Sequence, residues 1–150
     1  MPDDCVFCKI VSGAIPSQKI YEDEVAFAFF DIRPLALGHT LVVPKRHAVR
    51  FEDLDPDSAA KLWKAVHRIS PHVLKAVNAS ASTIAVNNGR DAGQEVPHVH
   101  VHVVPRFPGD GGGPIHALHW KRPNVTSDEL GKLAEKVRRA LPMQGKPAPV

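Results

Sequence analysis

Apolar residues along the chain form several short runs and one long helical pattern. Residues 25–30 are a continuous apolar run typical of a buried strand, and residues 39–43, which are followed by Pro44, predict a second strand. Residues 83–86 and 96–104 predict two further strands. Because the strands have hairpin-like spacing and accompany helices, we expect an α+β fold with a mainly antiparallel sheet.

One long amphipathic helix is predicted after Asp55-Pro56, which is an N-cap followed by proline at the first helical position. Apolar side chains then recur at helical spacing, at Leu62, Trp63, Val66, Ile69, Val73, Leu74 and Val77. Pro71 is expected to kink this helix or to split it near Ser70. A capping box at 126–129 predicts a C-terminal helix to about residue 140, before a disordered basic tail over 142–150.

The segment His98-Val99-His100-Val101-His102-Val103-Val104 alternates histidine with valine. Successive side chains of a strand point to opposite faces, so the three histidines are expected on one face and the valines on the other. The residues alone allow three interpretations of the three histidines: a polar strand face, a metal site, and a catalytic site in which one imidazole is the nucleophile. Histidine suits catalysis because its neutral form is nucleophilic near pH 7 and its cation donates to oxyanions.

Composition restricts the class of protein. The 150 residues fit one domain, and the net charge of +3 comes from the last 20 residues, so residues 1–130 sum to −1. Such a body has no basic cluster typical of nucleic-acid binding. The sequence has no apolar run of 18 residues and no secretory signal, and its two cysteines are too few for a disulfide framework. We therefore expect a cytoplasmic protein without nucleic-acid or membrane partners.

A set of motifs resembles one known family. HVHVHVV fits the pattern His-φ-His-φ-His-φ-φ, where φ is apolar, and CVFCKI, FFDIRP, GHTLVVPKRH, NNG and AGQEVPH appear in the expected order. From residue 5 to about 107 the sequence resembles the histidine triad (HIT) family, and within it the Hint-like branch. The resemblance implies the HIT fold, which we expect as a single domain over 1–141 with a C-terminal helical extension.

The resemblance implies a role for each histidine of the triad. Members of the family hydrolyse or transfer nucleoside monophosphates at the α-phosphorus, and the middle histidine, here His100, is the nucleophile. It would form a nucleotidyl-imidazole intermediate that water later opens. The backbone carbonyl of His98 would hold its other ring nitrogen, and His102 would contact the phosphate.

The same resemblance implies substrate contacts. Asp31 matches a ribose-binding carboxylate, whose alternative is an ordinary strand-end acid. Phosphate contacts are implied for His39, Asn87, Gly93 and Gln94, although Asn87 could be a turn residue and His39 an exposed strand end. An apolar slot for the base would draw on Val6, Phe7, Ile10, Phe29 and Ile32, which are equally typical of plain core.

A structural zinc ion is also implied. Cys5 and Cys8 have a metal-ligand spacing, although they could be buried thiols or a redox pair. In zinc-containing relatives two cysteines join a distant histidine and the first histidine of the triad, here His47 and His98. The resulting Cys2His2 set would be closed and therefore structural.

The remaining expectations concern partners and specificity. The resemblance implies a homodimer paired through the long helix and a sheet edge, in which a segment carrying His116, His119 and Trp120 approaches the partner's site. One residue departs from the family pattern, because Glu95 stands where Hint-like proteins usually have Ser or Thr. We expect a nucleotide hydrolase or transferase acting on purine nucleoside phosphoramidates or dinucleoside polyphosphates. The alternatives are a nucleotide-binding regulatory protein with vestigial activity and a zinc-dependent structural protein.

Overall fold

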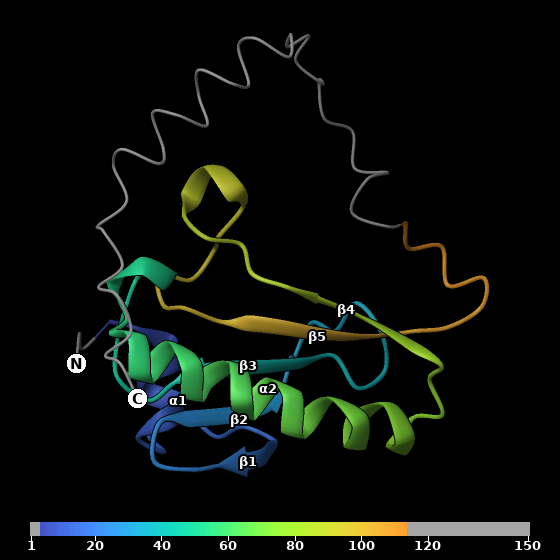
Figure 1. The fold of residues 1–150 in the computed structure, drawn as a ribbon, viewed down its shortest axis with the longest axis horizontal. Helices are drawn as coiled ribbons and strands as arrows, with labels where there is room; N and C mark the ends of the chain where they lie inside the picture. The colour runs from blue at the N-terminus through green and yellow to red at the C-terminus, as the bar shows by residue number, and fades with distance from the viewer. Residues whose placement is uncertain (1–3, 114–150) are drawn as a thin grey trace, which may run out of the picture. The chain divides into compact units, whose positions relative to one another are not determined.

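A computed structural model describes residues 4–113 of the chain (Figure 1). Within these residues the helices are α1 (Val6–Val11) and α2 (Pro56–Ala76), with 3₁₀ turns at Phe51–Asp53 and Arg90–Ala92. The strands are β1 (Lys19–Glu22), β2 (Ala26–Phe30), β3 (Thr40–Pro44), β4 (Ala81–Ala85) and β5 (Val101–Arg106). They form a sheet of order β1-β2-β3-β5-β4 in which every described pair is antiparallel, so the predicted α+β class is confirmed.

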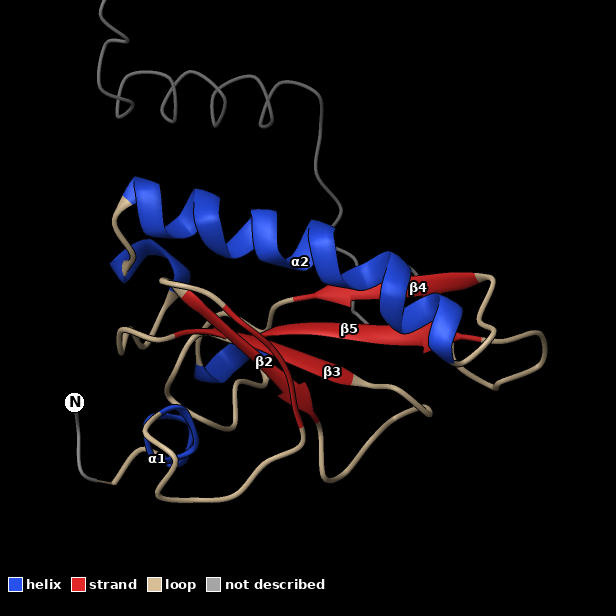
Figure 2. Cartoon of the chain, turned by 90° about the horizontal axis from the view of Figure 1, so that it is seen from below, coloured by secondary structure: helices blue, strands red, loops and turns tan. Residues whose placement is uncertain are grey.

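Helix α2 covers one face of the sheet (Figure 2). Its buried stripe contains Leu62, Val66, Ile69 and Val73, and it packs on side chains that alternate along the strands. These strand residues are Ala26, Ala28, Val42, Val101 and Val103, together with Val99 just before β5. Trp63 was expected in this stripe but is 41% exposed, because it lies beside the stripe rather than within it.

The start of α2 is as predicted, and of the two effects expected at Pro71, a kink or a split, the split is absent. The Asp55 carboxylate accepts from the backbone N–H of Ser58 at 2.9 Å, and Pro56 is the first helical residue. The helix then runs through Pro71 as a single element, so the predicted split near Ser70 does not occur. The Ser70 hydroxyl donates to the carbonyl of Val66 at 2.6 Å in the turn that Pro71 interrupts.

A second apolar cluster lies on the opposite face, beneath α1 (Figure 2). It joins Phe7 and Cys8 of α1 to Phe27, Phe29, Leu41 and Val43 of the sheet. Neither α1 nor β1 was predicted from the sequence. Helix α1 is six residues long without a side-chain cap, and β1 exposes three of its four residues, so neither has a strong apolar period.

The histidine-containing strand is shorter at its start than predicted. The expected strand covered 96–104, whereas β5 is Val101–Arg106. Before it, the N–H of His98 bonds the carbonyl of Val96 at 2.8 Å, and the N–H of Val99 bonds the carbonyl of Ala48 at 2.8 Å. These contacts replace a regular ladder, so only His102 of the three histidines lies within β5.

Several expectations lie outside the described residues. These are the C-terminal helix over 126–140, the tail over 142–150, and the segment with His116, His119 and Trp120. Among residues 4–113, neither helix has the length and hydropathy needed to cross a membrane.

Candidate active site and metal centre

The three histidines lie on the sheet face opposite α2. His98 and His100 are buried, and His102 is half-buried on β5. The ring centroids of His100 and His102 are 4.9 Å apart, whereas Val99, Val101 and Val103 belong to the core under α2. The predicted division of the two side-chain types between opposite faces is therefore correct, although the regular strand begins only at Val101.

His100 has one ring nitrogen fixed and the other available. Its Nδ1 is 2.7 Å from the backbone carbonyl oxygen of His98, and only a protonated nitrogen can bond that oxygen. In the neutral imidazole, Nε2 therefore carries the lone pair, and it has no hydrogen bond within residues 4–113. This is the tautomer that a nucleophilic histidine requires.

His39 and His102 form a hydrogen-bonded pair that orients a second donor toward the site. The N–H of Leu35 donates to Nδ1 of His39 at 3.2 Å, so Nε2 of His39 carries a proton and donates to Nδ1 of His102 at 3.0 Å. His102 must then hold its proton on Nε2. That atom is buried and has no partner among the described residues. An unused buried donor beside His100 is suited to an incoming anion.

Burial keeps both members of this pair neutral. The pKa of His102 is lowered from 6.5 to about 4, mainly by desolvation and further by His100 and His39. Desolvation also lowers the pKa of His39, against the opposing effect of Asp31. His39 is 2% exposed, so the alternative of an exposed strand-end residue is wrong.

Asp31 lies beside these histidines at the end of β2. Its Oδ1 accepts from the N–H of Arg33 at 2.8 Å, and its Oδ2 is 3.6 Å from Nδ1 of His39. The backbone N–H of Asp31 bonds the carbonyl of His39 at 2.9 Å, which ties the two residues together. Oδ2 has no hydrogen bond to another residue of the 4–113 segment, so it can accept from a ligand at the edge of the histidine cluster.

The loop over 87–94 contributes fewer free donors than predicted. Its turn depends on Gly89 and Gly93, whose φ angles are +96° and +86°. Asn87 is exposed, and its Nδ2 lies 3.9 Å from the position that a Cβ on Gly93 would take. The side chain of Asn88 instead joins the loop to the 3₁₀ turn at Phe51–Asp53, because it accepts from the N–H of Phe51 and donates to the carboxylate of Glu52.

Gln94 requires a correction. It was expected to offer its amide to a phosphate, but its Nε2 donates to the carbonyls of Val49 at 2.7 Å and Val96 at 3.0 Å. Its Oε1 accepts from the N–H of Gly89 at 2.7 Å. Both amide hydrogens are therefore used inside the protein, and Gln94 holds the loop in place. The next residue, Glu95, is exposed and makes no side-chain hydrogen bond among residues 4–113.

The residues expected to hold a base fall into two groups. Phe7 and Phe29 are buried and meet edge to face with centroids 5.7 Å apart, which is the core arrangement, and Ile10 packs against them. Phe7 also meets the ring of His100 at 5.2 Å. Ile32 is 90% exposed and Val6 is 36% exposed, so these two have apolar surface available to a ligand.

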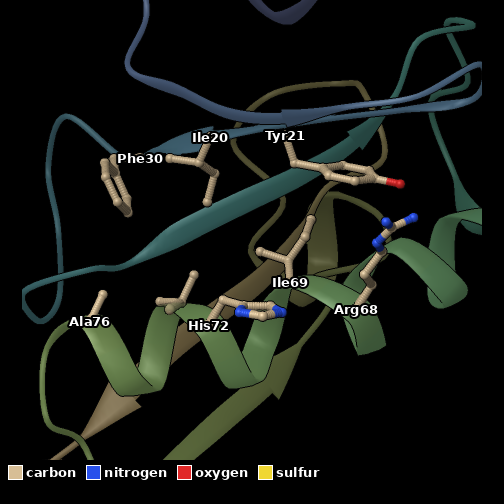
Figure 3. A pocket seen from close by; sticks show the side chains of 8 residues that line it. Ile20, Tyr21, Phe30, Arg68, Ile69, His72 and Ala76 are labelled. Atoms are coloured by element: carbon tan, nitrogen blue, oxygen red, sulfur yellow. The ribbon is translucent and has the colours of Figure 1, made fainter.

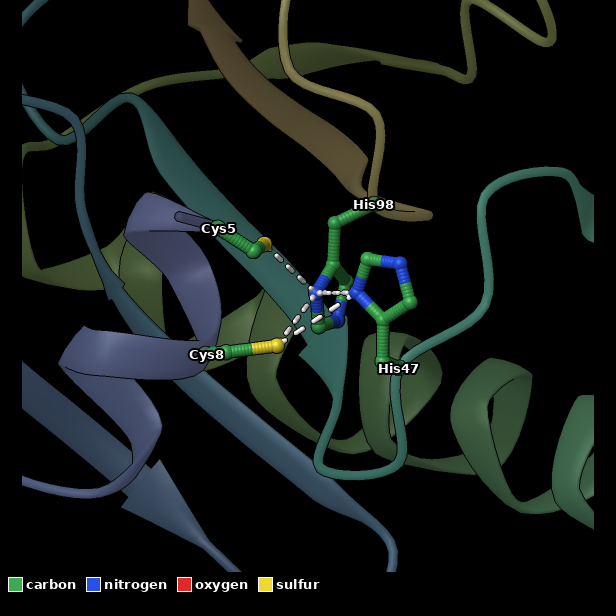
Figure 4. Close-up of side chains that lie close together, drawn as sticks. All are labelled: Cys5, Cys8, His47 and His98. Atoms are coloured by element: carbon green, nitrogen blue, oxygen red, sulfur yellow. Dashed lines mark hydrogen bonds between the residues drawn. The ribbon is translucent and has the colours of Figure 1, made fainter. Parts of the chain in front are cut away.

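The four expected metal ligands come together (Figure 4). Sγ of Cys5 is 3.4 Å from Nδ1 of His98, and Sγ of Cys8 is 3.4 Å from Nδ1 of His47. The two Nδ1 atoms are 3.3 Å apart. A tetrahedral ion with Zn–N of about 2.05 Å and Zn–S of about 2.3 Å needs N···N and N···S edges of about 3.3 and about 3.5 Å. The donor set therefore fits a tetrahedral metal ion.

A neighbouring contact prepares His98 for this role. Nε2 of His98 is 2.8 Å from the carbonyl oxygen of Pro44, so it carries the proton and leaves the Nδ1 lone pair facing the cysteines. Burial lowers the pKa of His98 to about 4, which favours the neutral ligand form. Burial and the adjacent Cys5 raise the pKa of the Cys8 thiol to about 11.

Sequence patterns identified the triad and the cysteine pair, and the family resemblance implied the His98 carbonyl as the partner of His100, but neither indicated the other contacts that orient these residues. The His39–His102 bond joins residues 63 positions apart, and the Pro44 acceptor is 54 positions from His98. No spacing rule relates such residues.

Comparisons with known proteins identify a family and similar structures. Residues 12–109 match the HIT domain family. An uncharacterised HIT-like protein of Methanocaldococcus jannaschii is 50% identical over 71% of this chain and 82% of its own. The adenosine 5′-monophosphoramidase hnt1 of Schizosaccharomyces pombe is 36% identical over 89% and 95%, and the adenylylsulfatase HINT3 of Arabidopsis thaliana is 40% identical over 71% and 54%.

Solved structures are similar over most of the chain. A Streptococcus mutans protein superposes with a TM-score of 0.84 at 40% identity, over 93% of this chain and 87% of that one. A zinc-bound histidine triad family protein of Mycobacterium smegmatis has a TM-score of 0.68 at 37% identity, over 92% and 98%.

Proposed function

The chain belongs to the HIT family, and on that premise we propose that it is a nucleotide hydrolase or transferase. It cleaves the bond between the α-phosphorus of a nucleoside monophosphate and a leaving group. The observation that carries this proposal is the fixed tautomer of His100, whose Nδ1–H bonds the carbonyl of His98 and whose Nε2 is free. Purine nucleoside phosphoramidates are the preferred substrates, and dinucleoside polyphosphates come next.

The reaction proceeds as two displacements. Nε2 of His100 attacks the α-phosphorus, the bond to the leaving group breaks, and the leaving group departs with its electron pair and takes up a proton from solvent. The imidazole becomes a nucleotidyl cation, and the charge strengthens its Nδ1–H bond to the His98 carbonyl. Water then attacks phosphorus and loses a proton to solvent, the bond between phosphorus and Nε2 of His100 breaks with its electron pair returning to the imidazole, and the nucleoside monophosphate is released.

Neighbouring groups stabilise charge and position the substrate. The unpartnered Nε2–H of His102 donates to a non-bridging phosphate oxygen, where negative charge grows in the transition state. The Oδ2 atom of Asp31 accepts from the ribose hydroxyls, and Asn87 contacts the phosphate side. The exposed Ile32 packs against the base.

Glu95 supports a second candidate function. A carboxylate at the end of the phosphate loop repels an anion when ionised, and Gln94 beside it has no amide hydrogen to spare. Both features favour either a leaving group different from that of phosphoramidates or a nucleotide-binding protein with vestigial activity. The fixed His100 tautomer favours the enzyme.

We also propose that the cluster of two cysteines and two histidines binds zinc. Cys5, Cys8, His47 and His98 would hold it with all four positions filled by protein, so the ion would be structural. It would supply a cross-link between α1 and the segment that precedes β5. The donor distances and the zinc-bound M. smegmatis relative support this assignment.

A homodimer is the third part of the proposal. Strand β4 lies at one edge of the sheet, and Ile84 on it is 43% exposed. Trp63 on α2 is 41% exposed. Pairing of two copies through α2 and the β4 edge would bury apolar surface and fill open ladder positions.

Release of AMP from adenosine 5′-phosphoramidate tests the enzymatic claim. His100→Asn removes the nucleophile, so we expect its kcat to fall by at least about 1000-fold. His67→Asn is the matched control, because it changes an exposed histidine of α2 and should retain full activity. Equal turnover by the His100 variant would overturn the mechanism. If no protein releases AMP from this substrate, adenylate esters or dinucleoside polyphosphates, the binding function becomes the conclusion.

A further inference from the structure

A groove of about 270 Å³ lies between the C-terminal half of α2 and the strands β1 and β2 (Figure 3). It is on the α2 side of the sheet, whereas the histidine triad is on the other side. The proposed nucleotide site therefore does not use it. The lining residues are Ile20, Tyr21, Phe30, Arg68, Ile69, His72, Val73 and Ala76.

A bulge in β1 creates one wall of the groove. The register of β1 against β2 shifts between Lys19 and Tyr21, which leaves Ile20 as the extra residue. Ile20 and Phe30 are left 37% and 38% exposed beside the helix. In Figure 3 these two side chains lie across the groove from Ala76, whose short side chain keeps that end open.

Among the described residues, the side chains that line the groove include one basic group and no acidic one, although the Asp23 carboxylate is bonded to the hydroxyl of the lining residue Tyr21. Arg68 is the only charged lining residue, and its guanidinium carbon lies 5.7 Å from the centroid of the Tyr21 ring. Within residues 4–113 it forms no ion pair with an acidic side chain. The Tyr21 hydroxyl is already bonded to Asp23 at 2.7 Å. His72 lies one turn beyond Arg68 on the same helix and offers a further donor.

We propose that this groove binds a small amphipathic carboxylate. The carboxylate would pair with Arg68, and an apolar tail would cover Ile20, Phe30 and Val73. The volume is slightly below that of pockets for drug-sized ligands, which suits a molecule of about ten non-hydrogen atoms. Within residues 4–113 the groove has no acidic lining residue, and the Asp23 carboxylate beside it is already engaged by the Tyr21 hydroxyl, so an anion is favoured over a neutral or cationic ligand.

Octanoate is the probe, and 1-octanol is its uncharged counterpart of equal chain length. Titration of the ¹⁵N-labelled full-length protein should give saturable amide shifts at Ile20, Phe30 and Val73, with octanoate binding more tightly than octanol. Two variants locate the site. Arg68→Met keeps an unbranched apolar stem without the charge, so we expect octanoate affinity to fall about fivefold while octanol affinity changes less than about twofold.

Ala76→Phe fills the open end of the groove and should weaken both probes by at least about tenfold. Lys64→Met is the matched control, because it removes an exposed charge of α2 outside the groove and should change neither affinity. Shifts that do not saturate, or that cluster away from the groove, overturn the proposal. Equal weakening of both probes by Arg68→Met also overturns it, because the groove would then be an apolar surface without anion recognition.

Discussion

Single hydrogen bonds decide which nitrogen of each central histidine is reactive. The carbonyl of His98 fixes His100, the carbonyl of Pro44 fixes His98, and His39 fixes His102. Each bond places one proton and thereby frees the opposite nitrogen. The resulting set contains a free lone pair on His100, an unused donor on His102 and a metal-facing lone pair on His98.

Sequence alternation could predict the side of each triad histidine, but not its tautomer. The face is a local property of extended backbone, and it survives even where the regular ladder is lost before Val101. The tautomers of His98 and His102 depend on Pro44 in β3 and on His39 just before β3. The partner of His100 is the His98 carbonyl, which the family resemblance implied and alternation alone did not. Gln94 shows the same limit, because its side chain bonds Val49, 45 positions away.

The neutral state of His102 predicts a pH dependence of stability. Its pKa is about 4 in the folded protein and about 6.5 when unfolded, so between these values only the unfolded chain binds the proton. The free energy of unfolding should therefore fall as the pH decreases from about 6.5 to 4, with no contribution from this group above that window. Urea midpoints measured from pH 7.5 to 4.5 check the slope.

His102→Asn isolates this contribution, because asparagine does not titrate while the metal ligands and His39 remain. As the pH decreases across the same range, the free energy of unfolding of the variant should fall less than that of the unaltered protein. Identical slopes for the two proteins would contradict the assignment of a depressed pKa to His102.

At the scale of elements, the short helix α1 depends on tertiary contacts. It has six residues and no side-chain cap, so its formation relies on Phe7 and Cys8 packing against the sheet. This explains why the sequence pattern predicted α2, with its cap and apolar stripe, but did not predict α1. The proposed metal centre would add a cross-link between α1 and the segment that enters β5.

Metal removal should therefore destabilise the domain. We expect a chelator to lower the Tm by on the order of 10 °C, because a ligand at 1000 times its Kd contributes about 4 kcal/mol. Elemental analysis of the untreated protein should give one zinc per chain. Cys8→Ser is the control, and its Tm should not respond to the chelator. A Tm of the unaltered protein that is equally insensitive, together with no bound zinc, would refute the structural zinc.

At the scale of the whole molecule, the sheet separates the proposed active site on one face from the main hydrophobic core on the other. The face under α1 carries the histidine triad, which the cysteines of the α1 segment approach, and the face under α2 carries the main core and the groove beside Ile20. The α+β class follows from the alternation of apolar runs with one amphipathic helix. The strand order β1-β2-β3-β5-β4 does not, because it depends on which strands meet across the long α2 connection.

The proposed dimer is tested by sedimentation. We expect a mass of two chains at micromolar concentration, and Ile84→Lys should shift the equilibrium toward monomers by placing a charge at the β4 edge. Ile32→Lys is the matched control, because it adds the same charge at an exposed site away from that edge. A monomeric unaltered protein would contradict the dimer and leave the His100 mechanism unaffected.

The stereochemical course at phosphorus tests the central claim most directly. One diastereomer of adenosine 5′-phosphorothioate amidate, hydrolysed in ¹⁸O-labelled water, gives a product whose configuration can be read by ³¹P NMR. Two successive displacements, first by His100 and then by water, predict overall retention of configuration. Inversion would mean that water attacks directly, and His100 could not then be the nucleophile.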